Sequence, residues 1–324
     1  MSPPSLSTAR LKPAGGLADL HRHLDGSMRP ATLLELSAAA GRPLAEVPRF
    51  FAGMGLQAAL DCFAITIAAL QTASAIERVA AEIAEDAARE GVTTLELRFA
   101  PQLHGGAAKG EPSGPRAIGW AVDAALAGLQ GRGGLLLCAL YGEAPEAVAA
   151  LVAVAAARPG VVGVDLAGGP APHHRYGMAD YASAFQAARR AGLGVTVHAG
   201  EGRPPAEIAF AIEHLGASRV GHGTTLLRDE AVLALVVRRQ VTIEACITSN
   251  VHVGAIAAAT DHDLPRWLDL GVRACICSDN TLLSAVDCRS EVELAGQLPG
   301  MDAEKLARAI AFGHGGRFGG GRGG

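Results

Sequence analysis

Two histidines separated by one residue, His21 and His23, end the first strand-like run of this 324-residue chain. Alternate residues of a β-strand point to the same face, about 7 Å apart, so the two imidazoles project side by side and can hold one metal ion. Such a pair also arises by chance on polar surfaces. Three further segments carry metal-type side chains at the ends of strand-like runs: His198-Ala199-Gly200-Glu201, Gly221-His222-Gly223 and Ser278-Asp279-Asn280. Together the four segments predict a metal-dependent active site.

The predicted donor set combines three imidazoles and one carboxylate, from His21, His23, His198 and Asp279. These donors suit a borderline divalent ion, Zn²⁺ foremost, provided that one position stays open for water. Two-metal barrel hydrolases commonly bridge their ions through a carbamylated strand lysine. The chain has three lysines, all outside the strand-like runs: Lys12, Lys109 and Lys305. One ion per chain is therefore favoured.

Two further polar residues accompany the predicted ligands. Glu201 lies three residues after His198, where a carboxylate can take a proton from water at the metal and pass it on. Taken alone, Glu201 would more readily be explained as compensating the positive end of a helix that begins near Pro204. His222 lies between two glycines, which usually bring backbone close to a ligand. This context favours a catalytic role for Glu201 and His222.

The elements that must position these residues alternate regularly. Eight strand-like runs are predicted at residues 17–23, 93–99, 135–140, 161–166, 194–198, 219–221, 241–245 and 274–278. Helices are predicted at residues 76–90, 115–128, 145–157, 180–191, 204–215, 229–239 and 262–270. Several of these runs are apolar rather than alternating, as parallel strands covered on both faces are. The pattern predicts an α/β fold, a (β/α)8 TIM barrel with chemistry at the C-terminal strand ends. An open doubly wound sheet is the alternative, but no Gly-rich phosphate turn follows the first strand.

The rest of the chain frames this barrel. Residues 1–16 are rich in Pro, Ser and Gly and are expected to be a disordered N-terminal segment, followed by a single barrel over residues 17–314. Residues 42–75 are too long for one crossover and predict a helical insertion after the first strand, either a substrate lid or packing decoration. Residues 315–324 are expected to be a flexible Gly/Arg tail rather than an RNA-binding segment.

Composition excludes several classes of protein. A net charge of −4 with no basic stripe argues against nucleic acid as a partner. Because no apolar run approaches about 20 residues, no membrane partner is expected. The six cysteines mostly lie in apolar runs, so Cys275-Ile276-Cys277 favours buried thiols over a thiolate metal site. The sequence predicts a cytoplasmic protein. It gives no prediction of the oligomeric state.

Seven segments in order make the sequence similar to the adenosine deaminase family of the amidohydrolase superfamily, from about Leu17 to about Phe312. Four are the metal-type segments, with the first extended to Gly26. The other three are Leu95-Glu96-Leu97-Arg98-Phe99-Ala100-Pro101, Val164-Asp165-Leu166-Ala167-Gly168 and Thr248-Ser249-Asn250. The resemblance implies a one-zinc aminohydrolase on a barrel.

The resemblance also implies roles residue by residue. His21, His23, His198 and Asp279 would ligate zinc, Glu201 would protonate purine N1, and His222 would orient the attacking hydroxide. Three positions would bind a purine substrate: Asp25 at a ribose 5′-hydroxyl, Gly168 at N3 and Asn280 at N7. Asp25 could instead cap a turn or the helix near Pro30, and Gly168 could serve backbone conformation alone.

Three departures concern the substrate. The best-known adenosine enzymes often carry a second aspartate where this chain has Asn280, whose amide donates to N7 at any pH. The loops Tyr141-Gly142-Glu143 and His173-His174-Arg175-Tyr176 do not match the family on the ribose side. Deamination of adenosine or 2′-deoxyadenosine is the leading prediction. Aminofutalosine, methylthioadenosine, adenine and N6-modified adenines are alternatives, followed by a mononuclear amide or ester hydrolase and then a non-catalytic binding protein.

Overall fold

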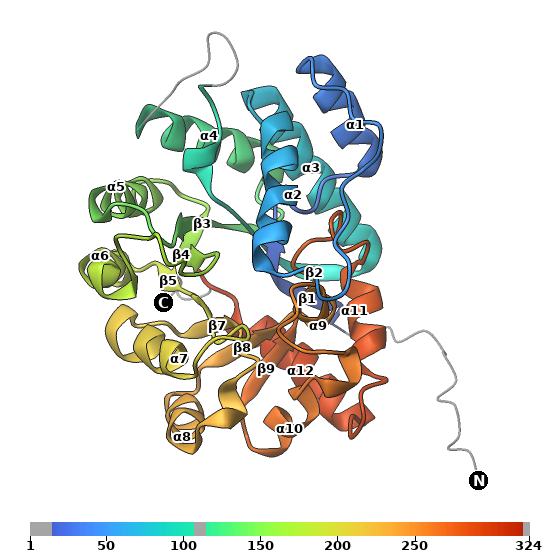
Figure 1. The fold of residues 1–324 in the computed structure, drawn as a ribbon, viewed down its shortest axis with the longest axis vertical. Coiled ribbons are helices and arrows are strands. Elements are labelled where there is room, and N and C mark those ends of the chain that lie inside the picture. Colours follow the sequence, from blue (N-terminus) through green and yellow to red (C-terminus); the bar gives the residue numbers. More distant parts are fainter. Residues whose placement is uncertain (1–14, 107–114, 320–324) are drawn as a thin grey trace.

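The computed structural model describes residues 15–106 and 115–319 and places parallel strands inside a ring of helices (Figure 1). The strand segments of the described residues are β1 (Leu17–His23), β2 (Val92–Phe99), β3 (Gly134–Leu140), β4 (Val161–Ala167), β5 (Gly194–Val195), β6 (His198–Ala199), β7 (Arg219–His222), β8 (Thr242–Ala245) and β9 (Arg273–Ile276). They form two parallel sheets, ordered β1 to β5 and β6 to β9. This arrangement confirms the predicted TIM barrel, since adjacent strands in sequence are adjacent in space.

The barrel closes where the end of the last strand meets β1. Asp279 follows β9 and bridges to Arg22. Its backbone N–H donates to the His21 carbonyl at 2.8 Å, and the His23 N–H donates to the Asp279 carbonyl at 2.8 Å. The backbone pairing that closes the barrel therefore also brings a predicted ligand from the last strand end beside the first two.

The predicted fifth strand, residues 194–198, is divided into β5 and β6. β5 pairs with β4 and β6 pairs with β7. Between them the Thr196 N–H still donates to the Val164 carbonyl at 3.1 Å, while the Thr196 hydroxyl donates to Glu244 at 3.0 Å inside the barrel. The two short segments thus occupy one barrel position.

Helices cover the outside of the barrel, and α4 to α8 follow its left-hand rim in Figure 1. The described helices are α1 (Pro30–Ala39), α2 (Leu56–Ala69), α3 (Ala73–Glu90), α4 (Pro115–Leu129), α5 (Pro145–Ala156), α6 (Ala182–Arg190), α7 (Ala206–Phe210), α8 (Glu230–Arg239), α9 (Ile247–His252), α10 (Leu264–Asp269), α11 (Cys288–Ala295) and α12 (Ala303–Gly316). The sequence prediction omitted α9, α11 and α12. α7 is shorter than predicted, because a π-helical turn at Ala211–Leu215 takes over its C-terminal half.

Helix ends follow ordinary capping chemistry. Thr72 precedes α3 and its side chain accepts from the Ala75 N–H, while Asp229 precedes α8 and accepts from two N–H groups. Gly91 ends α3 in the left-handed conformation at φ 91°. Such caps satisfy backbone groups that the helices leave open.

No single helix of the described residues is long and apolar enough to span a membrane. α2 and α3 would pass that test only as a pair, and they are bent by 116° at the break between them.

The predicted flexible tail, residues 315–324, does not begin at Gly315. α12 continues through Gly316, and the Phe318 N–H donates to Glu96. The Phe318 ring lies against Arg219, whose guanidinium carbon is 3.6 Å from the ring centroid. The error has a physical cause: Gly194 lacks a side chain, and a Cβ there would come within 2.2 Å of the Phe318 ring. Residues 320–324 lie outside the described residues.

The predicted disordered N-terminal segment, residues 1–16, lies outside the described residues except for its last two. The Gly15 carbonyl accepts from the Thr93 hydroxyl at 2.7 Å, and the Gly16 carbonyl lies 3.2 Å from His314 Nε2. The last two residues of the predicted segment therefore have defined contacts with the barrel.

Replacing Phe318 with alanine is expected to lower the free energy of unfolding by about 1–3 kcal/mol, because a half-buried ring and its cation–π contact are lost. Denaturant unfolding followed by circular dichroism would measure the change. Phe51→Ala is the matched control, since Phe51 is 63% exposed. Equal stability of the two variants would contradict a packed Phe318.

Candidate active site

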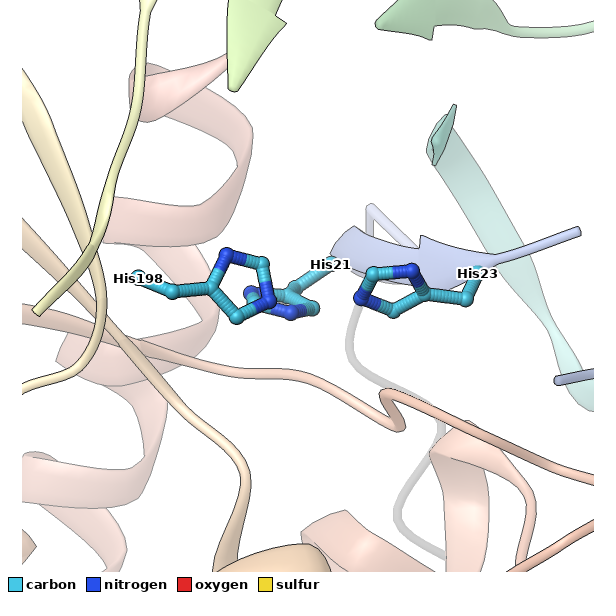
Figure 2. A group of neighbouring side chains, drawn as sticks. All are labelled: His21, His23 and His198. Carbon is cyan, nitrogen blue, oxygen red and sulfur yellow. The ribbon is translucent and has the colours of Figure 1, made fainter. Parts of the chain in front are cut away.

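Three imidazoles converge at the C-terminal end of the barrel (Figure 2). His21 and His23 come from β1 and His198 from β6, and one potential ligand atom from each lies within 4.8 Å of the others. Asp279 Oδ1 lies 3.6 Å from His21 Nε2 and 3.4 Å from His23 Nε2. The structure thus brings together all four residues that the sequence predicted as metal ligands.

The outer nitrogens of two imidazoles are occupied by carboxylates. His21 Nδ1 lies 2.7 Å from Glu244, and His198 Nδ1 lies 3.1 Å from Asp165. Each contact leaves Nε2 free to face the other ligands, and His21 Nε2 is buried with no hydrogen-bond partner among the described residues. A carboxylate behind an imidazole is the usual support of a metal-ligating histidine. The residues present therefore fit a metal ion.

The pKa shifts of two of the three imidazoles favour the neutral form, which is the form that binds a metal ion. Burial, then the charge of Arg98, lowers the pKa of His21, and burial, then His198, lowers the pKa of His23. Neutral imidazoles are the form that binds metal. Burial also acts to lower the pKa of His198, but Asp165 outweighs it and raises that pKa. A metal ion at His198 would therefore have to compete with a proton for the ring.

Arg98 on β2 joins the two supporting carboxylates. Its guanidinium donates to Asp165 Oδ2 and Glu244 Oε2, both at 2.9 Å, and to the Leu20 carbonyl at 2.6 Å. All three charged side chains are fully buried. The sequence alone assigns no role to Arg98, Asp165 or Glu244. A charged residue with apolar neighbours on both sides in a strand is a usable signal, because a buried charge must be paired.

Two site residues adopt the left-handed backbone conformation, His222 at φ 67° and Asp279 at φ 60°. Such strain in non-glycine residues is kept where a site requires it. Gly221 has a packing reason of its own: a Cβ there would lie 2.9 Å from His21 Cε1. The segment Gly221-His222-Gly223 is thus shaped around the His21 ring.

Glu201 and His222 lie side by side next to the predicted ligands. Glu201 Oε1 is 3.4 Å from His222 Nδ1, and the His222 ring centroid is 5.0 Å from that of His198. Burial raises the pKa of Glu201 and, with the charge of His198, lowers the pKa of His222 to about 3. A carboxyl that can hold a proton and a neutral imidazole therefore face the same space.

Asn250 on α9 contacts both residues, with its amide nitrogen 3.0 Å from His222 Nδ1 and 3.4 Å from Glu201 Oε1. The sequence analysis quoted Thr248-Ser249-Asn250 only as a matching segment. No local pattern could assign its partner, which lies 28 residues away in the chain.

A cavity of about 660 Å³ opens over this cluster. Its polar end includes Glu201, His222 and Asp279, and it also contains all three predicted substrate-binding residues, Asp25, Gly168 and Asn280. An apolar wall on α2 faces them, formed by Leu56, Ala59, Leu60, Phe63, Ala64 and Ile67. The predicted insertion, residues 42–75, therefore supplies part of the wall of the site.

The three predicted substrate-binding residues leave hydrogen-bonding groups or open space available for a ligand. Asp25 Oδ1 and Asn280 Oδ1 are buried without a partner among the described residues. Burial raises the pKa of Asp25 to about 7. Gly168 has φ 78°, a backbone conformation that favours glycine. An added Cβ would meet nothing within 4 Å, so the space beside Gly168 is also open. His104, which the sequence analysis did not single out, places Nε2 at 4.0 Å from Asp25 Oδ2.

Of the two loops that did not match the family, residues 141–143 contact the strand end that carries His198, and residues 173–176 pack against that first loop. The Tyr141 hydroxyl donates to the His198 carbonyl at 3.0 Å, and Glu143 accepts from Gln102 at 3.0 Å. His174 packs against Gly142, where a Cβ would come within 2.7 Å of its ring. Tyr141 thus helps to hold the strand end that carries His198.

The cysteines are free thiols, and all except Cys62 are buried. Cys275 and Cys277, 3.7 Å apart at sulfur, pack with Leu20 and Cys246, which confirms the prediction of buried thiols. Cys246 also lies within 4.8 Å of ligand atoms of His21 and Asp279. Burial raises its pKa far above that of a free thiol, which disfavours the thiolate that metals bind.

Comparison with known proteins identifies relatives over nearly the whole chain. The sequence profile of the family described as "Adenosine deaminase" matches residues 16–315. An adenosine deaminase of Klebsiella pneumoniae is 34% identical over 317 residues, covering 90% of each chain. A probable adenosine deaminase of Dictyostelium discoideum is 33% identical over 309 residues, which are 91% of this chain and 39% of that protein.

Two solved structures share the fold. The adenine deaminase of Arthrobacter aurescens superposes with a TM-score of 0.82 at 23% identity, covering 94% of both chains. The N6-mAMP deaminase of Arabidopsis gives a TM-score of 0.79 at 23% identity, covering 94% of this chain and 93% of that one. At this identity the likeness establishes the architecture, and substrate choice has to be argued from the site.

Proposed function

Because the chain belongs to the adenosine deaminase family, we propose that it is a zinc-dependent aminohydrolase that converts a 6-aminopurine nucleoside into the 6-oxopurine and ammonia. Adenosine and 2′-deoxyadenosine are the default substrates, and one zinc ion per chain is the proposed cofactor. One observation carries the proposal: three of the four proposed ligands, the Glu201–His222 pair and Asn280 all border a single cavity, and the fourth ligand, His21, lies directly beneath them against Asp279. The proposed partners are therefore a small purine and water.

His21, His23, His198 and Asp279 would hold the zinc ion in this proposal. When bound, zinc supplies Lewis acidity, which lowers the pKa of water from 15.7 to about 7 and so provides a nucleophile. Imidazole and carboxylate donors are the ligands that catalytic zinc takes. Because this donor set is also acceptable to other divalent ions, metal analysis of the purified protein is part of the test.

Glu201 lies beside His222 in the site, and burial raises its pKa, as suits a group that takes up and releases a proton. Its carboxyl takes the proton released by water and gives it to purine N1, while the oxygen adds to C6. His222 then stabilises the charge on that oxygen by a hydrogen bond. The second proton of the water, still on the oxygen now bound to C6, passes to the amino group. The C6–O bond becomes a carbonyl as the C6–N bond breaks, and ammonia leaves. Only the buried cavity end holds these groups, so the amino group has to point there.

Three residues along the cavity would orient the purine. Asn280 would donate from its amide to N7, the Gly168 backbone would contact N3, and Asp25 would meet the 5′-hydroxyl of a ribose. The Asn280 side chain is positioned by Gly26, because a Cβ at Gly26 would lie 1.9 Å from Asn280 Oδ1. The buried, partnerless Oδ1 of Asp25 supports a polar ligand at that point.

Replacing Asn280 with alanine is expected to weaken purine binding more than metal binding. The loss of one hydrogen bond in a buried site costs about 1–3 kcal/mol, which raises KM by roughly 5- to 150-fold. Steady-state kinetics and zinc titration of the same preparation would measure both effects. Equal losses of purine and zinc affinity would instead assign Asn280 a structural role.

The decisive experiment is ammonia release by zinc-loaded protein across a panel of 6-aminopurines: adenosine, 2′-deoxyadenosine, adenine, AMP, methylthioadenosine, aminofutalosine and N6-modified adenines. Fast release from a nucleoside supports the proposal. Fast release from adenine or an N6-modified adenine alone would keep the chemistry and replace the substrate. If no member of the panel released ammonia although zinc was bound, the result would favour a mononuclear amide or ester hydrolase.

A further inference from the structure

Asn250 is held rigidly at the rim of the site. Its backbone N–H donates to the Cys246 carbonyl at 2.9 Å, and its carbonyl accepts from the Ala255 N–H at 2.9 Å and the Ile256 N–H at 3.2 Å. The side chain is fully buried. A side chain with this support presents its amide in one place, which is the requirement for positioning a neighbour.

The Asn250 amide nitrogen faces a ring nitrogen and a carboxylate oxygen. It carries two hydrogens, and the two nearest polar atoms are His222 Nδ1 at 3.0 Å and Glu201 Oε1 at 3.4 Å. An amide nitrogen is a donor only. A donor at 3.0 Å requires a lone pair on His222 Nδ1, so in a neutral imidazole the proton resides on Nε2.

The reversed amide is the alternative arrangement. It would direct Asn250 Oδ1 at the Glu201 carboxylate, oxygen against oxygen, and would leave a buried NH₂ group without an acceptor. In the arrangement observed, the atom left without a partner among the described residues is the carbonyl oxygen Oδ1. An unsatisfied carbonyl is tolerated more often than an unsatisfied N–H, so the observed orientation is the favourable one.

We propose that Asn250 is a positioning residue, which fixes His222 as the neutral tautomer with its proton on Nε2 and holds Glu201 beside it. The functional consequence, which rests on the proposed deamination, is a division of labour. His222 then acts only as a hydrogen-bond donor to the oxygen that adds to C6, since its Nε2 has no lone pair. Proton transfer falls to Glu201 alone. Preoriented donors of this kind stabilise developing negative charge.

The test combines a spectrum with kinetics. Full-length protein with ¹⁵N-labelled histidine rings, loaded with Zn²⁺, is examined by NMR, and His222 is assigned from the signals lost in His222→Gln. We expect Nδ1 to hold a lone pair and Nε2 to hold the proton. In Asn250→Asp the side chain accepts only, so the proton is expected to move to Nδ1, and kcat is expected to fall by about 10²- to 10³-fold with little change in KM.

Two further variants keep the test sharp. Asn250→Ala removes the donor without adding charge and is expected to give mixed tautomers with reduced kcat. Val251→Ala, on the same helix, is expected to keep the wild-type spectrum and rate. Protonated Nδ1 in the wild-type protein, or Asn250→Asp with unchanged tautomer and kcat, would overturn the proposal. A correct tautomer in a protein that deaminates no aminopurine would leave the Asn250 assignment standing and refute the proposed function instead.

Discussion

Glu201→Gln is expected to lower kcat by about 10²- to 10⁴-fold while the protein still binds one equivalent of zinc, because the amide cannot accept or deliver the proton that the reaction moves. Glutamine keeps the volume of the side chain, and it can still accept from Asn250 through its carbonyl oxygen. Glu201 belongs to neither group of converging potential ligand atoms, one of which contains the three histidines and the other Asp279. Loss of rate should therefore be separable from loss of metal.

Ammonia release with the substrate that proves fastest, together with metal analysis of the same samples, would measure both quantities. Glu213→Gln is the matched control, because Glu213 is exposed on the π-helical turn that follows α7 and should leave both unchanged. If Glu201→Gln lost zinc together with activity, Glu201 would be a ligand and not a proton shuttle. If it kept most of its rate, the proton would be moved by another group.

The convergence of the four proposed ligands could be predicted from sequence because two local facts suffice. Residue type indicates which side chains bind zinc, and a position at the end of a strand in a (β/α)8 pattern places each at the same rim of the barrel. His21, His23, His198 and Asp279 all meet both conditions. Closure of the barrel then brings Asp279 to His21 through backbone pairing that the strand order already implies.

The supporting residues could not be predicted in the same way, since their roles depend on partners distant in the chain. Glu244 lies 223 residues from His21, and Asn250 lies 49 residues from Glu201. The predicted flexibility was wrong at residues 315–318, for a related reason. The composition of this tail resembles that of a linker. Phe318 nevertheless packs against Gly194 and Arg219, and the sequence of the tail gives no sign of this contact.

Arg98→Met is expected to lower the free energy of unfolding by about 3–5 kcal/mol, because it leaves two buried carboxylates without their shared cation. Methionine replaces most of the volume, so the loss measures charge and hydrogen bonding more than packing. The same change should weaken zinc binding by about 10- to 100-fold, since Asp165 and Glu244 orient His198 and His21. Denaturant unfolding of the metal-free protein and zinc titration with a competing chelator would measure the two effects.

An arginine on the surface provides the control that isolates burial. Arg89 is 67% exposed and pairs with Asp86 and Glu85 on the same helix, so Arg89→Met should cost at most about 1 kcal/mol and leave zinc affinity unchanged. Asp165→Asn complements it, because it keeps the shape of the network while weakening the acceptor behind His198. If Arg98→Met were as stable as Arg89→Met and bound zinc normally, the imidazoles would be held in place by the barrel backbone alone. A loss of stability with unchanged zinc affinity would assign Arg98 to the core and not to the metal site, whereas loss of both would show that the charge inside the barrel also orients its ligands.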